Sequence, residues 1–133
     1  MLYVLILTDP ELSYDDYSED FLIGIFETEN QAKQTAEFYL ENVKGFCDYS
    51  CSYRIIPKKI YGNFISDRAW IVYGYDINEY SDEINIIESR CCMTKQEAES
   101  ELENMKKSYK RDEWDISCMI IGEKYWQDGF ERA

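Results

Sequence analysis

A threonine followed three residues later by glutamine or glutamate occurs twice in this chain, at positions 66 residues apart. Thr28 precedes Gln31, and Thr94 precedes Glu97. In such a capping box the threonine hydroxyl and the later side chain satisfy backbone N–H groups at the start of a helix. Apolar residues at helical spacing follow both boxes. The sequence therefore predicts two equivalent helices, over about residues 29–43 and 95–110.

Short apolar runs flank the two boxes at similar distances. They lie at residues 2–7 and 21–26 before the first box, 70–75 and 84–92 before the second, and 53–56 and 115–121 after the two helices. Strand, strand, helix and strand thus follow one another twice. This order predicts an α+β fold made by tandem ββαβ duplication, with two helices packed on antiparallel sheet. A single ferredoxin-like sheet is the alternative, because β-α-β-β-β-α-β is contained in the same order.

The two units are expected at residues 1–66 and 67–133. A unit of ~65 residues buries too little apolar surface to be stable alone, so both are expected to pack as one compact domain. The almost wholly apolar run at 2–7 is typical of a central strand. Pro57 lacks an N–H to give a ladder, so its strand is expected to lie at an edge or to bulge there. Gly45 is expected at the C′ position of the first helix, with Phe46 folded back onto the last turn.

Several short motifs resemble a family of small bacterial ββαβ domains of unknown function. Those domains open with V-Y-x-L, continue through L-I-G-x-[YF] and close with W-x-E-G-F. The corresponding residues here are Tyr3-Val-Leu5, Leu22-Ile-Gly-Ile-Phe26, Gly45-Phe46 and Trp126-Gln-Asp-Gly-Phe130. The match is best over residues 1 to about 60, and Arg90 stands where a counterpart of Gly24 would fall. The resemblance implies the ββαβ fold and supplies no activity.

The charge of the chain restricts its function. It has 27 acidic and 14 basic residues, a net charge of −13, and no histidine. Such a charge disfavours direct contact with nucleic acid or an anionic membrane and favours a basic partner. Without histidine, the usual general base near neutral pH and the commonest transition-metal ligand are missing. We therefore expect no enzyme, no cofactor and no metal site.

The five cysteines, which are odd in number and form no C-x-x-C pair, are predicted to be reduced and mostly buried thiols with raised pKa values. They are Cys47, Cys51, Cys91, Cys92 and Cys118. A redox or metal role for Cys47 and Cys51 stays open. No basic residue precedes the apolar run at 2–7, which therefore predicts a strand in place of a signal peptide, and a cytoplasmic location is expected.

Acidic residues and tyrosines alternate in the two predicted hairpin loops, at 9–20 and 75–83. The candidate partner-binding residues are Asp9, Glu11, Tyr14, Asp15, Asp16, Tyr17, Glu19 and Asp20 in the first loop, and Tyr75, Asp76, Glu79, Tyr80, Asp82 and Glu83 in the second. Carboxylates attract a cationic surface, and tyrosines are frequent anchors in interfaces. The alternative interpretation is that these loops are solvated connections without a binding role.

The sequence thus favours a non-catalytic acidic binding protein that inhibits a nucleic-acid-binding partner by occupying its basic groove. An anti-CRISPR or DNA-mimic-like inhibitor and an immunity protein of a nuclease toxin both fit this description. The alternative is a small-molecule or metal-binding regulatory module whose pocket lies between the two units. The identity of the partner and the oligomeric state stay open.

Overall fold

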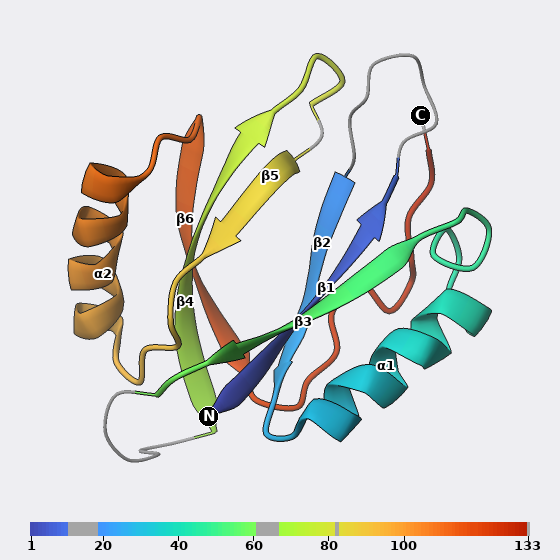
Figure 1. The fold of residues 1–133 in the computed structure, drawn as a ribbon, viewed down its shortest axis with the longest axis horizontal. Helices are drawn as coiled ribbons and strands as arrows, with labels where there is room; N and C mark the ends of the chain where they lie inside the picture. Colours follow the sequence, from blue (N-terminus) through green and yellow to red (C-terminus); the bar gives the residue numbers. More distant parts are fainter. Residues whose placement is uncertain (11–18, 61–66, 82, 133) are drawn as a thin grey trace.

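The computed structural model describes residues 1–10, 19–60, 67–81 and 83–132 of the chain, and the predicted order of elements is confirmed there (Figure 1). The elements are β1 (Leu2–Asp9), β2 (Glu19–Phe26), α1 (Glu29–Asn42), β3 (Ser52–Lys58), β4 (Arg68–Ile77), β5 (Glu83–Glu88), α2 (Lys95–Ser108) and β6 (Glu113–Ile120). They form two separate antiparallel sheets, ordered β2-β1-β3 and β5-β4-β6. The first strand of each unit is central in its own sheet, which confirms the α+β duplication over the single-sheet alternative.

Both helices begin at the residue that the capping boxes predict. The Thr28 hydroxyl accepts from the Gln31 N–H at 3.1 Å, and the Thr94 hydroxyl accepts from the Glu97 N–H at 3.2 Å. Each helix is 14 residues long. The helices end slightly earlier than expected, at Asn42 and Ser108, because the following residues adopt an extended backbone.

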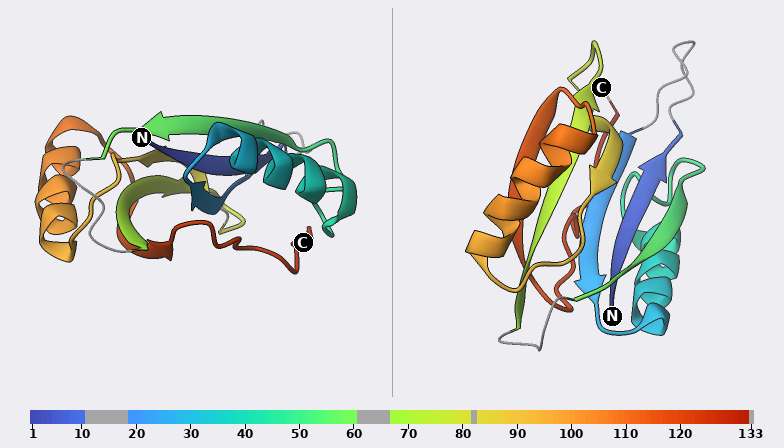
Figure 2. Two further views of the ribbon diagram at one scale, coloured as in Figure 1. Left: turned by 90° about the horizontal axis from the view of Figure 1, so that it is seen from below. Right: turned by 60° about the vertical axis from the view of Figure 1, so that its left-hand side comes forward.

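The two sheets pack face to face, with one helix on the outer face of each (Figures 1 and 2). Strand β1 shows how its apolar run serves two cores. Leu5 and Leu7 pack in the cluster beneath α1, whereas Val4 and Ile6 pack against the second sheet. Because side chains alternate across a strand, one apolar run fills both layers. Residues of both units therefore form the inter-sheet core.

Two local predictions in the first unit are confirmed and one is wrong. Pro57 lies in β3, an edge strand, opposite Tyr3 of β1. Phe46 is buried, with its ring centroid 5.6 Å from that of Tyr39 in α1. Gly45 does have a positive φ of 84°, but it is not the C′ residue. The helix is capped by Val43, and Gly45 belongs to the turns that follow.

The predicted strand at 84–92 is too long, since β5 ends at Glu88. The reason is a side chain. The hydroxyl of Ser89 accepts from the Val72 N–H at 2.9 Å and takes the place of a backbone carbonyl in the ladder. Beyond it, Cys91 and Cys92 make only isolated bridges, to Ile60 and Trp70.

The C-terminal segment leaves the second unit and packs on the first (Figure 1). The N–H groups of Gly122 and Tyr125 donate to carbonyls of β2 at 2.7 and 2.8 Å. Phe130 then enters the core beneath α1, stacked on Phe21 with a centroid distance of 4.6 Å. The second unit, expected at 67–133, thus supplies part of the core of the first.

Candidate functional site: the anionic end

The end of β1 and the start of β2 lie on the same side of the molecule as the turn between β4 and β5 (Figure 1). The start of β2 lies beside the start of β5, because Asp20 Oδ2 accepts from the Ile86 N–H at 3.4 Å and Asp20 and Glu83 line one cavity. Strand β6 also begins there, since Glu113 is the antiparallel partner of Tyr75 near the end of β4.

Carboxylates from all of these strand ends gather on this side, which we call the anionic end. The described ones are Asp9, Glu19, Asp20, Asp76, Glu79, Glu83, Asp112, Glu113 and Asp115. Basic residues also lie on this side of the described chain: Lys110 and Arg111 in the connection before β6, Arg132 beside Asp9, and Arg54 of β3, whose Nη2 donates to the Ile86 carbonyl at 3.4 Å. Acidic side chains thus predominate.

The sequence-based prediction missed the last three carboxylates, Asp112, Glu113 and Asp115. They are distant in sequence from both hairpins, at the start of the last strand. A signal was available, because antiparallel pairing of β6 with β4 necessarily returns the start of β6 to the hairpin end. Six predicted residues lie outside the described part of the chain: Glu11, Tyr14, Asp15, Asp16, Tyr17 and Asp82.

Asp9 does not present its carboxylate to solvent as expected. It lies at the end of β1, is 1% exposed, and receives both Nε and Nη2 of Arg132 at 2.9 and 2.5 Å. A buried carboxylate requires such a partner, because desolvation of an unpaired charge is costly. Asp9 therefore holds the structure together internally.

Asp76 lies in β4, not in a loop, and is also used internally. Its Oδ1 accepts from the Asp112 N–H at 3.1 Å, and its Oδ2 accepts from the Asn85 amide at 3.2 Å. In return, Asp112 Oδ2 accepts from the Ile77 N–H at 3.0 Å. These bonds tie the end of β4 to the segment before β6 and fix the relative positions of the surrounding acids.

The tip of the β4–β5 hairpin presents its side chains outward. Glu79 is exposed, and Tyr80 is 49% exposed. Beneath them, Asn78 is buried, and its side-chain oxygen accepts from the Tyr80 N–H at 2.9 Å. An asparagine that bonds to the backbone two residues on is a turn-forming arrangement. The carboxylate and the tyrosine therefore stand on a defined turn.

Three titratable groups at this end have raised pKa values, mainly because they are desolvated and secondarily because acids lie nearby. Partial burial, with the charge of Asp115 adding to it, raises the pKa of Glu83. Burial, followed by the charges of Asp115 and Glu83, raises the pKa of Tyr73 to about 12. The pKa of Tyr75 is also raised, by desolvation and by the hydrogen bond that its hydroxyl donates to Asp115 at 3.0 Å. Ionisation of these three groups is therefore disfavoured, chiefly by desolvation and further by the neighbouring carboxylates.

A cavity of about 230 Å³ opens between the two sheets at the anionic end. It occupies the position where a pocket between the units was anticipated. Its lining consists of Asp20, Leu22, Tyr73, Glu83, Ile86, Ser117, Met119, Tyr125 and Trp126.

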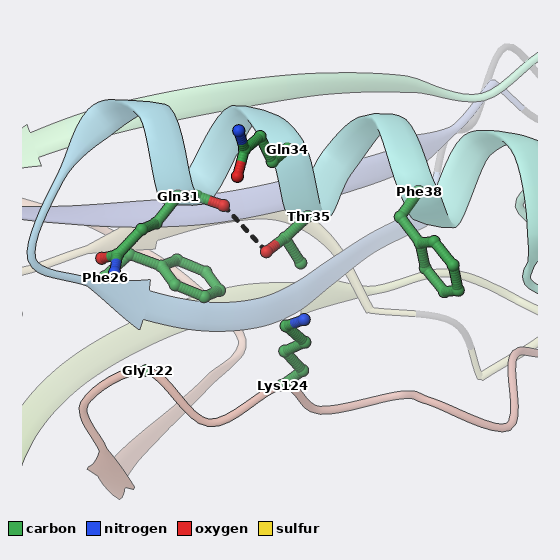
Figure 3. Close-up of a pocket in the computed structure, with 7 residues that line it drawn as sticks. All are labelled: Phe26, Gln31, Gln34, Thr35, Phe38, Gly122 and Lys124. Carbon is green, nitrogen blue, oxygen red and sulfur yellow. Dashed lines mark hydrogen bonds between the residues drawn. The ribbon is translucent and has the colours of Figure 1, made fainter.

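A second cavity, of about 290 Å³, has a different chemistry (Figure 3). It lies between α1 and the C-terminal segment and is lined by Phe26, Gln31, Gln34, Thr35, Phe38, Gly122 and Lys124. The Thr35 hydroxyl is already used, since it donates to the Gln31 carbonyl at 2.8 Å. The lining contains one cation and no carboxylate, so this cavity does not extend the anionic end.

The thiols are less buried than expected. Cys91 and Cys92 are buried, but Cys47 and Cys118 are exposed and Cys51 is intermediate. Burial raises the pKa of Cys91 to about 12 and those of Cys92 and Cys51 to about 11. The expected rise therefore holds for these three, although desolvation is its main cause; carboxylates contribute less at Cys51 and Cys92 and do not contribute at Cys91. Among the described residues, no group of three or more cysteine, aspartate or glutamate side chains could hold a metal ion.

No protein-family model, curated protein or solved structure matches the chain. The resemblance to the small ββαβ domains therefore stays a prediction from the motifs. In the described part of the chain, neither helix is long and apolar enough to cross a membrane.

Proposed function

We propose that the protein is a non-catalytic acidic inhibitor that occupies the basic groove of a nucleic-acid-binding protein. The observation that supports this most directly is the gathering of carboxylates from β2, β5, β6 and the β4–β5 turn at one end of the molecule. A field concentrated at one end steers a partner into one orientation, which a uniformly acidic surface cannot do.

The anionic end also has the apolar contacts that an interface needs. Tyr80 and Ile77 are 49% and 44% exposed and stand beside Glu79. Interfaces obtain most of their binding energy from a few aromatic or apolar anchors, and charges at the rim mainly increase the association rate. A partner whose groove normally holds phosphates would meet the carboxylates first and then bury these side chains.

The matched pair of charge-reversal variants tests where binding occurs. Glu79→Lys with Glu113→Lys reverses two exposed charges at the anionic end. Glu99→Lys with Glu103→Lys reverses two exposed charges on α2 and changes the net charge equally. Each protein is immobilised and used to capture proteins from a bacterial lysate at low salt, followed by elution with salt and identification. A captured protein is then purified, and displacement of a fluorescent DNA or RNA duplex from it is measured by anisotropy.

We expect wild type to capture nucleic-acid-binding proteins and to compete with the duplex, with affinity that falls steeply as salt rises. The anionic-end variant should bind about tenfold more weakly, equivalent to ~1.4 kcal/mol, and the α2 variant should bind like wild type. Equal loss in both variants would mean that only net charge matters. A captured protein that the duplex does not displace would contradict occupation of the groove.

The two biological settings differ in the partner recovered. A guide-loaded or restriction nuclease indicates an anti-CRISPR or DNA-mimic-like inhibitor, and a nuclease toxin indicates an immunity protein.

The inter-sheet cavity favours the alternative, a small-molecule regulatory module, to the extent that it offers a pocket between the units. That function predicts a thermal shift with a metabolite and no effect of either charge-reversal pair. A thermal-shift screen of metabolites with the purified protein therefore separates the two functions.

A further inference from the structure

The cavity between the sheets has a lining of one charge sign. Asp20 enters it from β2 of the first sheet, and Glu83 enters from β5 of the second. No lysine or arginine is among its lining residues. Two carboxylates that converge from opposite sheets, without an internal cation between them, form a site that a cation would neutralise.

The two carboxylates differ in how much hydrogen-bonding capacity they retain. Asp20 is held in place, because Oδ1 accepts from the Thr8 hydroxyl at 2.7 Å and Oδ2 accepts from the Ile86 N–H. Within the described chain, Glu83 has no side-chain hydrogen bond and no ion pair. An ionised carboxylate can accept about four hydrogen bonds, so the acceptor capacity of Glu83 is unused inside a partly buried site.

Aromatic rings form the remaining walls. Tyr73, Tyr125 and Trp126 all line the cavity. Trp126 packs edge-on against Phe21 with a centroid distance of 4.9 Å, and the Tyr125 hydroxyl accepts from the Ile120 N–H at 3.2 Å. These contacts hold two of the walls in place. Ring faces attract a cation that is removed from water, and planar guanidinium groups stack on them especially well.

Its size restricts the occupant. At about 230 Å³ the cavity lies below the ~300–1,000 Å³ typical of sites for whole small molecules, yet it far exceeds the space needed for one water. Trp126 is 48% exposed, so the cavity reaches the surface. The end of one long side chain meets this limit.

We propose that this cavity receives the guanidinium group of an arginine side chain from the basic partner. The inference rests on the proposed function and adds an anchor to it. Arginine is favoured over lysine, because its fork of five donors can serve Glu83 and Asp20 together while its plane stacks on an aromatic wall.

Titration with isolated model compounds tests the cavity without a partner. The ¹⁵N–¹H spectrum of the full chain contains indole signals from its three tryptophans, and Trp126 alone lines the cavity. The probes are n-butylguanidinium, n-butylammonium and the neutral n-butylurea, together with N-acetylarginine N-methylamide, which presents the side chain on a peptide backbone. The variants are Glu83→Gln, the cavity-filling Ser117→Met, and the matched control Glu99→Gln, which removes the same charge from the exposed face of α2.

We expect n-butylguanidinium and N-acetylarginine N-methylamide to shift the Trp126 indole signal saturably, with a Kd on the order of 1 mM. Binding of n-butylammonium should be weaker, and n-butylurea should not bind. Glu83→Gln should weaken binding at least about fivefold and Ser117→Met should abolish it, whereas Glu99→Gln should leave it unchanged.

Equal effects of Glu83→Gln and Glu99→Gln would overturn the proposal, as would saturable binding of n-butylurea. Binding of n-butylguanidinium without binding of N-acetylarginine N-methylamide would assign the cavity to a free small-molecule guanidinium compound and overturn the proposal of a partner's arginine.

The two proposals fail in different ways. Salt-sensitive partner binding that survives Ser117→Met unchanged would overturn the arginine anchor and leave the acidic inhibitor in place. If the cavity binds guanidinium but the protein captures no partner with a nucleic-acid-binding groove, the inhibitor proposal is overturned and the cavity site is retained.

Discussion

Arg132 and Asp9, separated by 123 residues, form a bidentate ion pair that joins the two ends of the chain at the anionic end. The Asp9 carboxylate is 1% exposed, and the Arg132 guanidinium also lies 3.7 Å above the Tyr49 ring centroid. The neighbouring pair, Lys44 with Glu131, is mostly exposed to solvent. Two adjacent residues thus form one buried and one exposed ion pair, and the difference in burial determines their contributions to stability.

Arg132→Ala should lower the free energy of unfolding by about 3 kcal/mol, because it leaves the Asp9 carboxylate buried without its cation. Glu131→Ala is the matched control and should cause no measurable change, since exposed pairs contribute little. Urea unfolding followed by circular dichroism measures both. Equal effects of the two substitutions would show that the pair at Asp9 is not the stabilising one.

Gly129→Ala should be strongly destabilising. Gly129 has φ of 76°, and an added Cβ would lie 2.0 Å from the Lys44 carbonyl oxygen. The C-terminal segment would have to move away from the first unit, at a cost of about 3 kcal/mol or more.

Gly122→Ala separates this clash from backbone strain. Gly122 has φ of 90°, but its added Cβ would meet nothing within 4 Å. We expect a cost of only about 1 kcal/mol, from the left-handed backbone alone. Similar losses for the two glycines in thermal unfolding would refute the close contact at Lys44.

Thr28→Ala and Thr94→Ala should each cost about 1 kcal/mol, because each removes the hydroxyl that accepts the N–H of the third residue along its helix. The caps lie in different units, so the double variant should show the sum of both effects. Chemical denaturation of the three variants provides the comparison. Replacement by serine, which retains the hydroxyl, should restore most of the loss.

Glu83→Gln should stabilise the protein at neutral pH. The raised pKa of Glu83 in the folded state means that folding favours its protonated form. Below the pKa that Glu83 has in the unfolded state, its carboxyl is protonated in both states and does not change the free energy of unfolding. As pH rises through the pKa of the folded state, the ionised carboxylate destabilises the fold. Because Glu83 is partly exposed, solvent screening limits the gain to about 1–3 °C in Tm at pH 7.

The difference in Tm between Glu83→Gln and wild type should vanish near pH 3, where the glutamate is protonated in both states. Glu79→Gln serves as the control for net charge, since Glu79 is exposed on the hairpin turn. A gain of equal size in both variants would point to general charge repulsion in place of the local environment of Glu83.

The cysteines should separate by reactivity with a thiol reagent such as DTNB at pH 8. Cys47 and Cys118 are exposed and should react first. Cys91 and Cys92 are buried, with pKa values raised to about 12 and about 11, and should react only on unfolding. Mass spectrometry of the labelled peptides assigns each site. Rapid labelling of Cys91 in the native protein would contradict its burial.

The architecture could be predicted from the sequence because its signals are local. Thr28 and Thr94 cap helices through N–H groups three residues away, and the apolar run at 2–7 has the composition of a central strand. Such information acts over one helical turn or one strand. It therefore determined the elements, their order, and the duplicated ββαβ pattern.

The candidate site was predicted only in part, because membership in it depends on distant pairings. Glu79 and Glu83 follow from the hairpin itself. Asp115 joins them through pairing of β6 with β4, and Asp9 loses its exposure to Arg132 at the far end of the chain. These contacts join residues that are far apart in the sequence, whereas the periodicity of a helix or strand relates only residues that are close together.

The sequence by itself determined the secondary structure, the internal repeat and the excess of negative charge. Only the tertiary structure decided which carboxylates are buried, that Phe130 completes the core of the other unit, and that Asp20 and Glu83 face one cavity. The physical reason is that hydrogen bonds within an element are fixed by neighbouring residues. How two sheets pack depends on the total apolar surface that they bury together, and no single segment contains that information.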